Sequence, residues 1–152
     1  MQPPIFRLLS RGAEQAAGFK LMQQLRPHLS DLESFSMQLD RQAYHGYRLW
    51  GMWQGDQLAG LIGFRELENL IYGRFIYVDD LIVDPAMRQS GLGMALLDKV
   101  REEARLRGCA HLVLDTGLHM ALAQRFYFRA GLLARGMHFV QPLEAAQESA
   151  HA

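Results

Sequence analysis

The segment from Arg88 to Met94 is the part of the sequence best suited to binding a phosphate group. Gly91 and Gly93 remove side chains from positions where a ligand could approach the backbone, and a helix is expected to follow them. The first N–H groups of a helix have no acceptor within it, and the helix dipole favours a negative charge there. The segment therefore predicts a pyrophosphate site with Arg88 as a fixed positive charge. A tight strand-to-helix turn without a ligand explains the glycines, taken alone, equally well.

Three other side chains could move a proton. Asp79 and Asp80 are neighbours in a strand-like stretch, so they point to opposite faces unless a β-bulge intervenes. Either one could instead be a structural, hydrogen-bonded carboxylate. Tyr127 stands beside Phe126 near the end of a predicted helix, where an aromatic ring is more often part of the core. The six histidines form no H-E-x-x-H or Cys-His pattern, so no metal is expected.

Hydrophobic periodicity predicts the elements that position these residues. Residues 74–83 form the strongest strand, 93–107 the strongest helix and 111–115 a short buried strand. The helix is a crossover between the two strands, which are therefore expected to run parallel and to diverge at one end. The remaining expected elements are a strand at 5–9, a helix at 13–25, a second helix opened by a capping box at Ser30–Glu33 and closed at His45–Gly46, a hairpin of 47–53 and 58–64 followed by a polar connection at 66–69, a helix at 120–130 and a final strand at 137–142. This order indicates a mixed α/β layer fold.

Length and composition narrow the class of protein. The chain has 152 residues, 49% of them hydrophobic, and its 16 basic and 16 acidic residues give a net charge of +0. We expect one domain over residues 1–142 and a flexible tail at 143–152. A balanced charge argues against nucleic acid as a partner, and no apolar run is long enough to cross a membrane. The single cysteine, Cys109, fits core packing in a cytoplasmic protein.

Two motifs together resemble the GNAT superfamily of N-acetyltransferases. The first is Arg88-x-x-Gly91-x-Gly93, which follows a strand and opens a helix, and the second is Ala123-x-x-Phe126-Tyr127-x-x-x-Gly131. The resemblance is strongest over residues 77–131. It implies a GNAT-like fold with a central mixed sheet, in which the strand before the glycine loop carries a bulge. The two parallel strands then splay apart and hold acetyl-CoA between them.

The resemblance also implies which residues contact acetyl-CoA. The glycine loop surrounds its phosphates, and the preceding strand offers backbone groups to its pantetheine arm. The residues implied are Leu81, Ile82, Val83, Arg88, Gln89, Ser90, Gly91, Leu92, Gly93 and Met94. The family often has an Asn that contacts the CoA arm where this chain has Met120, so that single contact is not expected here.

The reaction that the resemblance implies is direct transfer of an acetyl group to a primary amine of a small molecule or a peptide. Asp79 is the favoured base, since the family often places an acid on this strand at positions matching Tyr77 or Asp79. Asp80 is either the alternative base or a structural carboxylate, and a water molecule could relay the proton. Tyr127 matches the tyrosine that often protonates the departing thiolate. No metal takes part.

The acceptor itself is left open by the sequence. The second helix and the first hairpin are expected to form its pocket, with several aromatic residues nearby and His138 as a further candidate. These aromatics are Tyr44, Tyr47, Trp50, Trp53 and Tyr72. A catalytically silent acyl-CoA sensor is the main alternative to an enzyme, because it needs the glycine loop but neither Tyr127 nor Asp79. A structural subunit without CoA is a second alternative, and a homodimer is open beside a monomer.

Overall fold

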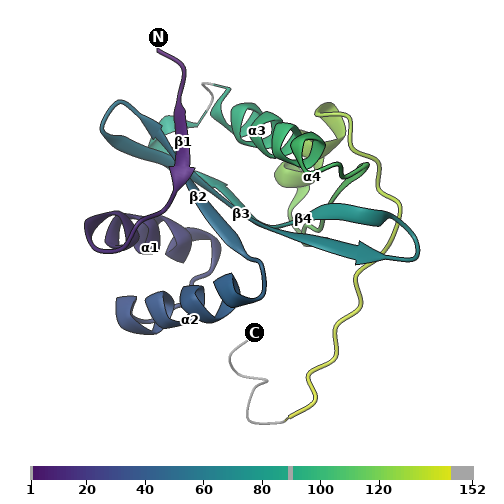
Figure 1. Cartoon of the computed structure of the whole chain (residues 1–152), viewed down its shortest axis with the longest axis horizontal. Helices are drawn as coiled ribbons and strands as arrows, with labels where there is room; N and C mark the ends of the chain where they lie inside the picture. The colour runs from purple at the N-terminus through teal and green to yellow at the C-terminus, as the bar shows by residue number, and fades with distance from the viewer. Residues whose placement is uncertain (1, 89–90, 145–152) are drawn as a thin grey trace. The chain divides into compact units, whose positions relative to one another are not determined.

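A computed structural model describes residues 2–88 and 91–144 of the chain (Figure 1). The chain divides between Leu114 and Asp115 into two compact units, which are described separately. The N-terminal unit contains all the strands found in the described residues. Residues 145–152, most of the predicted flexible tail, lie outside the described part of the chain.

The N-terminal unit is built on a five-stranded sheet whose spatial order follows the chain. Neighbouring strands are antiparallel except for the last pair, which is parallel as the crossover predicted. The strands are β1 (Ile5–Leu8), β2 (Arg48–Gln54), β3 (Gln57–Asn69), β4 (Gly73–Val83) and β5 (His111–Leu114). The polar connection predicted at 66–69 is wrong, because these residues continue β3 and pair with the start of β4. Cross-strand pairing extends this hairpin despite its polar sequence.

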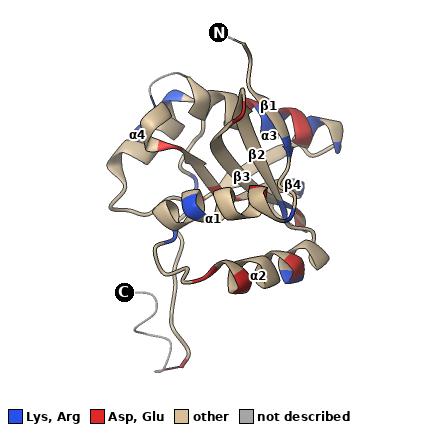
Figure 2. Ribbon diagram, turned by 90° about the vertical axis from the view of Figure 1, so that its left-hand side faces the viewer, with Lys and Arg blue, Asp and Glu red and all other residues tan. Residues whose placement is uncertain are grey.

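Helices cover both faces of this sheet. Helix α1 (Ala13–Leu25) and helix α2 (Leu32–Tyr44) lie on one face, and α3 (Leu92–Leu106) lies on the other (Figure 1). On the α1 side, Met22, Phe35 and Leu61 belong to one buried cluster. On the α3 side, Leu96, Leu97 and Val100 are completely buried. The helices α2 and α3 carry charged side chains of both signs (Figure 2).

The N-cap of α2 differs from the one predicted at Ser30. Asp31 occupies the cap, and its Oδ1 accepts a hydrogen bond of 2.8 Å from the Ser34 backbone N–H. The helix therefore begins one residue later than a capping box on Ser30 requires. Aspartate and serine are about equally effective as N-caps, so the residue type alone does not decide whether Ser30 or Asp31 caps α2.

A β-bulge interrupts β4 where the two aspartates lie. Phe64 of β3 pairs with Val78 and Gly63 pairs with Asp80, so Asp79 has no partner in this register. The extra residue alters the alternation of side chains between the faces. The parallel pairing of β4 with β5 ends at Val78, one residue before the bulge. Beyond that point no described strand adjoins the second edge of β4.

The C-terminal unit contains helix α4 (Ala121–Arg129), as the periodicity predicted for residues 120–130. The final strand predicted at 137–142 is wrong, because these residues have no regular secondary structure. Phe139 and Val140 are exposed there. A β-branched and aromatic sequence favours a strand only when a partner strand satisfies its backbone, and this segment has none within the part of the chain described.

Candidate active site

The glycine segment opens α3 as the sequence predicted. Gly91 is the N-cap, and its φ of 77° is a left-handed conformation that favours glycine. The first backbone bond of the helix runs from the Ala95 N–H to the Gly91 carbonyl at 3.1 Å. The N–H groups of Leu92, Gly93 and Met94 therefore precede the first helical hydrogen bond. This end of α3 offers backbone donors and the positive end of a helix dipole to an anion.

The residues before this helix complete the candidate phosphate site only in part. Arg88 is exposed, whereas Gln89 and Ser90 lie outside the described residues. Upstream, Asp84 caps the short helix η1 (Pro85–Met87) by accepting the Ala86 N–H at 3.0 Å. The Asp84 N–H also donates to the Ala59 carbonyl at 2.8 Å, which fixes the end of β4. The turn into α3 therefore starts from an anchored strand.

The three β4 residues predicted to meet the pantetheine arm lie between the bulge and that turn. Leu81, Ile82 and Val83 pair with Ile62, Leu61 and Gly60 of β3. Ile82 is buried in the cluster beneath α1 and α2. Because β5 ends opposite Val78, the second edge of β4 is without a described strand at these residues. That edge is the one along which a ligand could make strand-like backbone hydrogen bonds.

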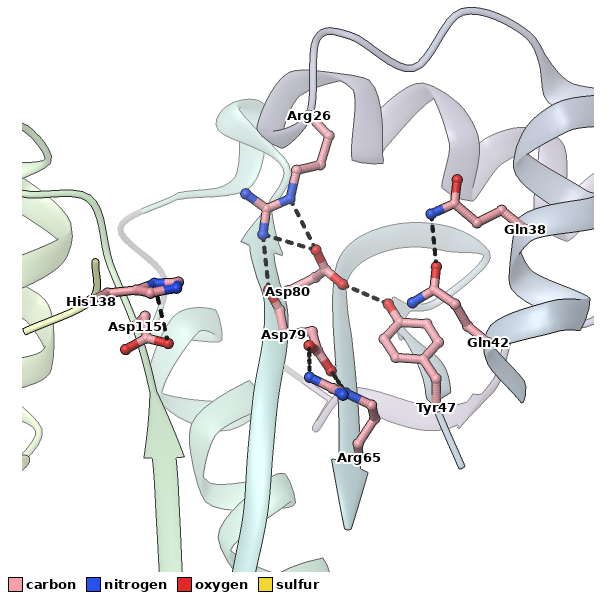
Figure 3. Close-up of polar contacts among 9 residues, drawn as sticks. All are labelled: Arg26, Gln38, Gln42, Tyr47, Arg65, Asp79, Asp80, Asp115 and His138. Atoms are coloured by element: carbon pink, nitrogen blue, oxygen red, sulfur yellow. Dashed lines mark hydrogen bonds and ion pairs between the residues drawn. The ribbon is translucent and has the colours of Figure 1, made fainter. Parts of the chain in front are cut away.

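Asp79, the extra residue of the bulge, is held by Arg65. Two nearly parallel hydrogen bonds join them, from Arg65 Nε to Oδ2 at 2.9 Å and from Arg65 Nη2 to Oδ1 at 2.8 Å (Figure 3). Burial raises the pKa of Asp79, while the Arg65 guanidinium opposes that rise. The carboxylate is therefore positioned firmly and carries a pKa above its ordinary value, which moves it toward the range of a general base.

Asp80 is the centre of a second polar cluster. Its Oδ2 accepts a hydrogen bond of 2.7 Å from the Tyr47 hydroxyl, and its Oδ1 accepts one of 3.1 Å from Arg26 Nε (Figure 3). Arg26 is the C-cap residue of α1, and its Nη2 also donates to the Asp79 carbonyl at 2.9 Å. The cluster thus joins the end of α1, the start of β2 and the bulge. Burial and the nearby Asp80 charge raise the pKa of Tyr47 well above its ordinary value.

Gly63 makes room for this cluster. A Cβ at Gly63 would collide with the Tyr47 ring and hydroxyl, so the tyrosine fills space that a side chain on β3 would otherwise occupy. Gly63 also pairs directly with Asp80 across the sheet. The close approach of the Tyr47 side chain to the β3 backbone therefore depends on glycine at this position.

Both aspartates line one cavity of about 240 Å³. The sequence predicted that the two side chains point to opposite faces unless a bulge intervenes. The bulge at Asp79 does intervene, and both side chains line the same cavity. The cavity lies beneath the loop between α1 and α2, and apolar side chains form part of its wall: Met22, Leu29, Phe35 and Leu39. Tyr47 is the one member of the predicted aromatic set that lines it.

The C-terminal unit holds the predicted acid and the predicted pocket histidine. Tyr127 lies in the last turns of α4, with its ring 5.3 Å from that of Phe126 between centroids. Burial raises the pKa of its phenol, so it keeps its proton at neutral pH. His138 Nδ1 lies 3.7 Å from Asp115 Oδ2 (Figure 3). An ion pair forms there only when the imidazole is protonated.

Sequence reasoning missed the two arginines that hold the aspartates. Arg26 is 54 residues from Asp80 and Arg65 is 14 residues from Asp79. The antiparallel pairing of β3 with β4 brings Arg65 close, and this proximity follows from the predicted hairpin order. Nothing local marks Arg26, since it reaches the bulge only through the packing of α1 on the sheet.

No metal site or membrane span is found in the residues that the structure describes. Among residues 2–88 and 91–144, no group of three or more His, Cys, Asp or Glu side chains could hold a metal ion. None of the helices in those same residues is long and apolar enough to span a bilayer.

The sequence matches a known protein family over most of its length. The acetyltransferase (GNAT) family matches residues 16–132. An IAA acetyltransferase of Azospirillum brasilense is 33% identical over 64 residues. That match spans 42% of this chain and 42% of the relative, so the chain covers less than half of the curated protein that it resembles.

Solved structures share the fold over nearly the whole chain. A Trypanosoma brucei acetyltransferase is 20% identical, with a TM-score of 0.77 over 92% of this chain and 99% of that one. AAC(6')-Iy in complex with a CoA-S-monomethyl-acetylneamine bisubstrate analogue is 14% identical, with a TM-score of 0.77 over 93% and 99%. A transcriptional regulator from Bacillus halodurans C-125 is 18% identical, with a TM-score of 0.81 over 92% and 99%. At these identities the likeness concerns the fold.

Proposed function

Because this chain belongs to the GNAT family of acetyltransferases, we propose that it transfers the acetyl group of acetyl-CoA directly to a primary amine bound in the cavity beside Asp79 and Asp80. The observation that carries this proposal is the course of β4. One strand contributes both aspartates to the cavity, then presents an edge without a described strand partner, and then leads into the N-terminus of α3. An acceptor site and an anion site are therefore joined by a few residues of extended backbone.

The cosubstrate is proposed to lie along this backbone. The N–H groups that begin α3, together with Arg88, bind its pyrophosphate. Leu81, Ile82 and Val83 offer backbone groups to the pantetheine arm, whose amides can pair with a strand edge. This arrangement ends with the thioester near the bulge, where a backbone N–H can polarise the carbonyl and stabilise the oxyanion.

Acetyl transfer at the bulge requires that the ammonium of the acceptor lose a proton and that the CoA thiolate gain one. The ammonium first gives a proton to Asp79, directly or through water, and the neutral nitrogen attacks the thioester carbon. The C–N bond forms, the C–S bond breaks, and the CoA thiolate takes a proton from Tyr127. The acylated nitrogen loses its second proton, which returns through water to the tyrosinate, and Asp79 releases its proton to solvent. The acetylated amine and CoA then leave.

A matched pair of glycine variants tests where acetyl-CoA binds. Gly91 and Gly108 stand at opposite ends of α3 with φ values of 77° and 73°, and an added Cβ at either meets no described atom within 4 Å apart from its chain neighbours. Valine is therefore expected to impose a comparable backbone strain at both positions. Calorimetry with CoA is expected to show that Gly91→Val loses most of the affinity while Gly108→Val keeps it. Equal affinities in two folded variants would remove the α3 N-terminus as the phosphate site.

A catalytically silent CoA sensor is a second candidate function. The observation that favours it is that both carboxylates of the cavity are already paired with arginines. Incubation of the protein with acetyl-CoA and a panel of amines separates the two functions, with free thiol and acetylated product both measured. Thiol release in step with product establishes transfer, whereas tight binding without either would leave the sensor.

A further inference from the structure

The cavity beside Asp79 and Asp80 has a charge pattern that restricts its occupant. Its lining includes one guanidinium, that of Arg26, and two carboxylates. Arg26 is committed to Asp80, with Nη2 at 3.0 Å from Oδ1, and also donates to the backbone of Asp79. Arg65, which binds Asp79 through both oxygens, approaches from β3 and is not part of the lining. Every described arginine that reaches these carboxylates is thus already neutralised.

An anionic group entering this cavity would therefore meet no uncompensated positive charge. It would lose part of its hydration and lie near two carboxylates, which costs more free energy than placing a neutral polar group there. A cation also meets paired charges, since both carboxylates bind arginines, but it finds hydrogen-bond acceptors. Asp79 and Asp80 each have lone pairs beyond those that Arg65, Arg26 and Tyr47 occupy, and these can accept ammonium N–H bonds.

The rest of the cavity wall suits an acceptor that is short and uncharged apart from its reacting amine. One side is apolar, as described above, and the other carries amides on α2. Gln38 Nε2 donates to Gln42 Oε1 at 3.1 Å, which leaves the Gln38 carbonyl oxygen and the Gln42 amino group as hydrogen-bonding groups of the wall. A volume of about 240 Å³ equals that of about eight water molecules at roughly 30 Å³ each. The remaining basic residue of the lining, His28, is exposed to solvent.

From this pattern we infer that the acceptor is a small, non-acidic primary amine: its body carries no carboxylate, phosphate or sulfate. The inference rests on the proposed acetyl transfer and adds the class of amine. Free α-amino acids and phosphorylated amino sugars fall outside this class. Amines whose far end is a hydroxyl, an amide or a second amine fall within it.

Isosteric pairs of amines test the inference directly. In 5-aminopentanamide and 5-aminopentanoate the reacting amine and the number of heavy atoms are the same, and only the charge of the far end differs. The second pair is 4-(aminomethyl)benzamide and 4-(aminomethyl)benzoate. Rates of thiol release are compared at about pH 8.5, above the range in which imidazoles ordinarily carry a proton. The kcat/KM of each amide is expected to exceed that of its acid at least about tenfold.

A charge-gain variant sharpens the test. Gln38→Lys adds an ammonium to the lining of the cavity, at a position whose side chain is exposed in the wild type. It is expected to lower the amide-to-acid ratio about tenfold. Gln24→Lys makes the same change at a position of α1 that is equally exposed but lies outside the lining, and it should leave the ratio within about twofold.

The possible outcomes separate this inference from the proposed function. If the acids are acetylated as fast as the amides or faster, transfer stands and the class of acceptor is wrong. If Gln38→Lys and Gln24→Lys change the ratio equally, the cavity is not where the far end of the amine binds, and the inference fails. If no member of either pair is acetylated by protein that binds acetyl-CoA, the proposed transfer fails and takes the inference with it.

Discussion

Removing the Tyr47 hydroxyl is expected to destabilise the N-terminal unit by about 1.5 kcal/mol. Tyr47 is only 3% exposed, and its hydroxyl donates to Asp80 over 2.7 Å. Hydrogen bonds to charged groups contribute roughly 1.5–3 kcal/mol to stability. The lower end applies to Tyr47→Phe, because the Asp80 carboxylate keeps Arg26 as a partner and the ring keeps its packing.

Asp80→Ala should cost more, about 3 kcal/mol. It leaves a buried phenol without an acceptor and removes the carboxylate that neutralises Arg26. Breaking a fully buried ion pair costs roughly 3–5 kcal/mol. The Arg26 side chain is 43% exposed, so water recovers part of that loss. The double variant should resemble Asp80→Ala alone, which gives a coupling free energy of about 1.5 kcal/mol between the two side chains.

Urea unfolding followed by tryptophan fluorescence measures these differences, since Trp50 and Trp53 both lie in β2 of this unit. Tyr44→Phe is the matched control, because Tyr44 is 88% exposed and should unfold like the wild type. A double variant whose cost equals the sum of the single costs within about 0.5 kcal/mol would refute the hydrogen bond as an energetic link. Gly63→Ala offers an independent check. It forces the Tyr47 ring to move, so its cost should fall markedly when Tyr47 is already alanine.

Three other predictions concern turnover and acid stability. Tyr127→Phe should lower turnover by roughly a hundredfold while melting temperature and acetyl-CoA affinity hold, and near-normal turnover would remove Tyr127 from the mechanism. Asp79→Asn should slow the reaction more than Asp80→Asn and should abolish the acidic limb of the kcat/KM–pH profile, because only deprotonated Asp79 is a base; a slower Asp80 variant reverses the assignment. Hydrogen bonds, first from the Arg7 guanidinium, lower the pKa of Glu14 from 4.5 to about 2. Its contribution to stability is therefore present above pH 4.5 and lost as pH falls toward about 2, so the destabilisation caused by Glu14→Gln should be measurable at pH 7 and vanish near pH 2.

The crossover from β4 through α3 to β5 could be predicted from sequence because each element carries its own signal. Strand residues in β4 are aromatic and β-branched, the α3 face repeats at helical spacing, and Gly91 marks the helix start. Each of these signals depends only on residues that are close in the sequence, so it can be recognised without knowledge of the tertiary structure. The glycine segment was predicted to open this helix for the same reason, and its role as a phosphate site stays a prediction.

The family resemblance implied a bulge in the strand before the glycine loop, and β4 has one, but local sequence signals predict neither its position at Asp79 nor the partners of the two aspartates. A bulge is a mismatch between two strands, so neither strand reveals it alone. Whether Asp79 and Asp80 share a cavity depends on where that mismatch falls. Arg26 meets Asp80 only after α1 has packed on the sheet. The strand predicted at 137–142 failed for a related reason. Its residues favour extended backbone, but no described strand pairs with them.

The register around the bulge has a consequence for how this chain could change over generations. The pairs Phe64–Val78 and Gly63–Asp80 flank Asp79 on both sides, so Asp79 is an insertion into an otherwise continuous ladder. Loss of its single codon would leave the register pairs of β3 and β4 on both sides of Asp79 in sequence. It would also delete the proposed base and remove the carboxylate that binds Arg65. One in-frame deletion therefore separates the proposed catalyst from a chain that keeps the proposed CoA site, and the reverse insertion is an equally short genetic route to the proposed activity.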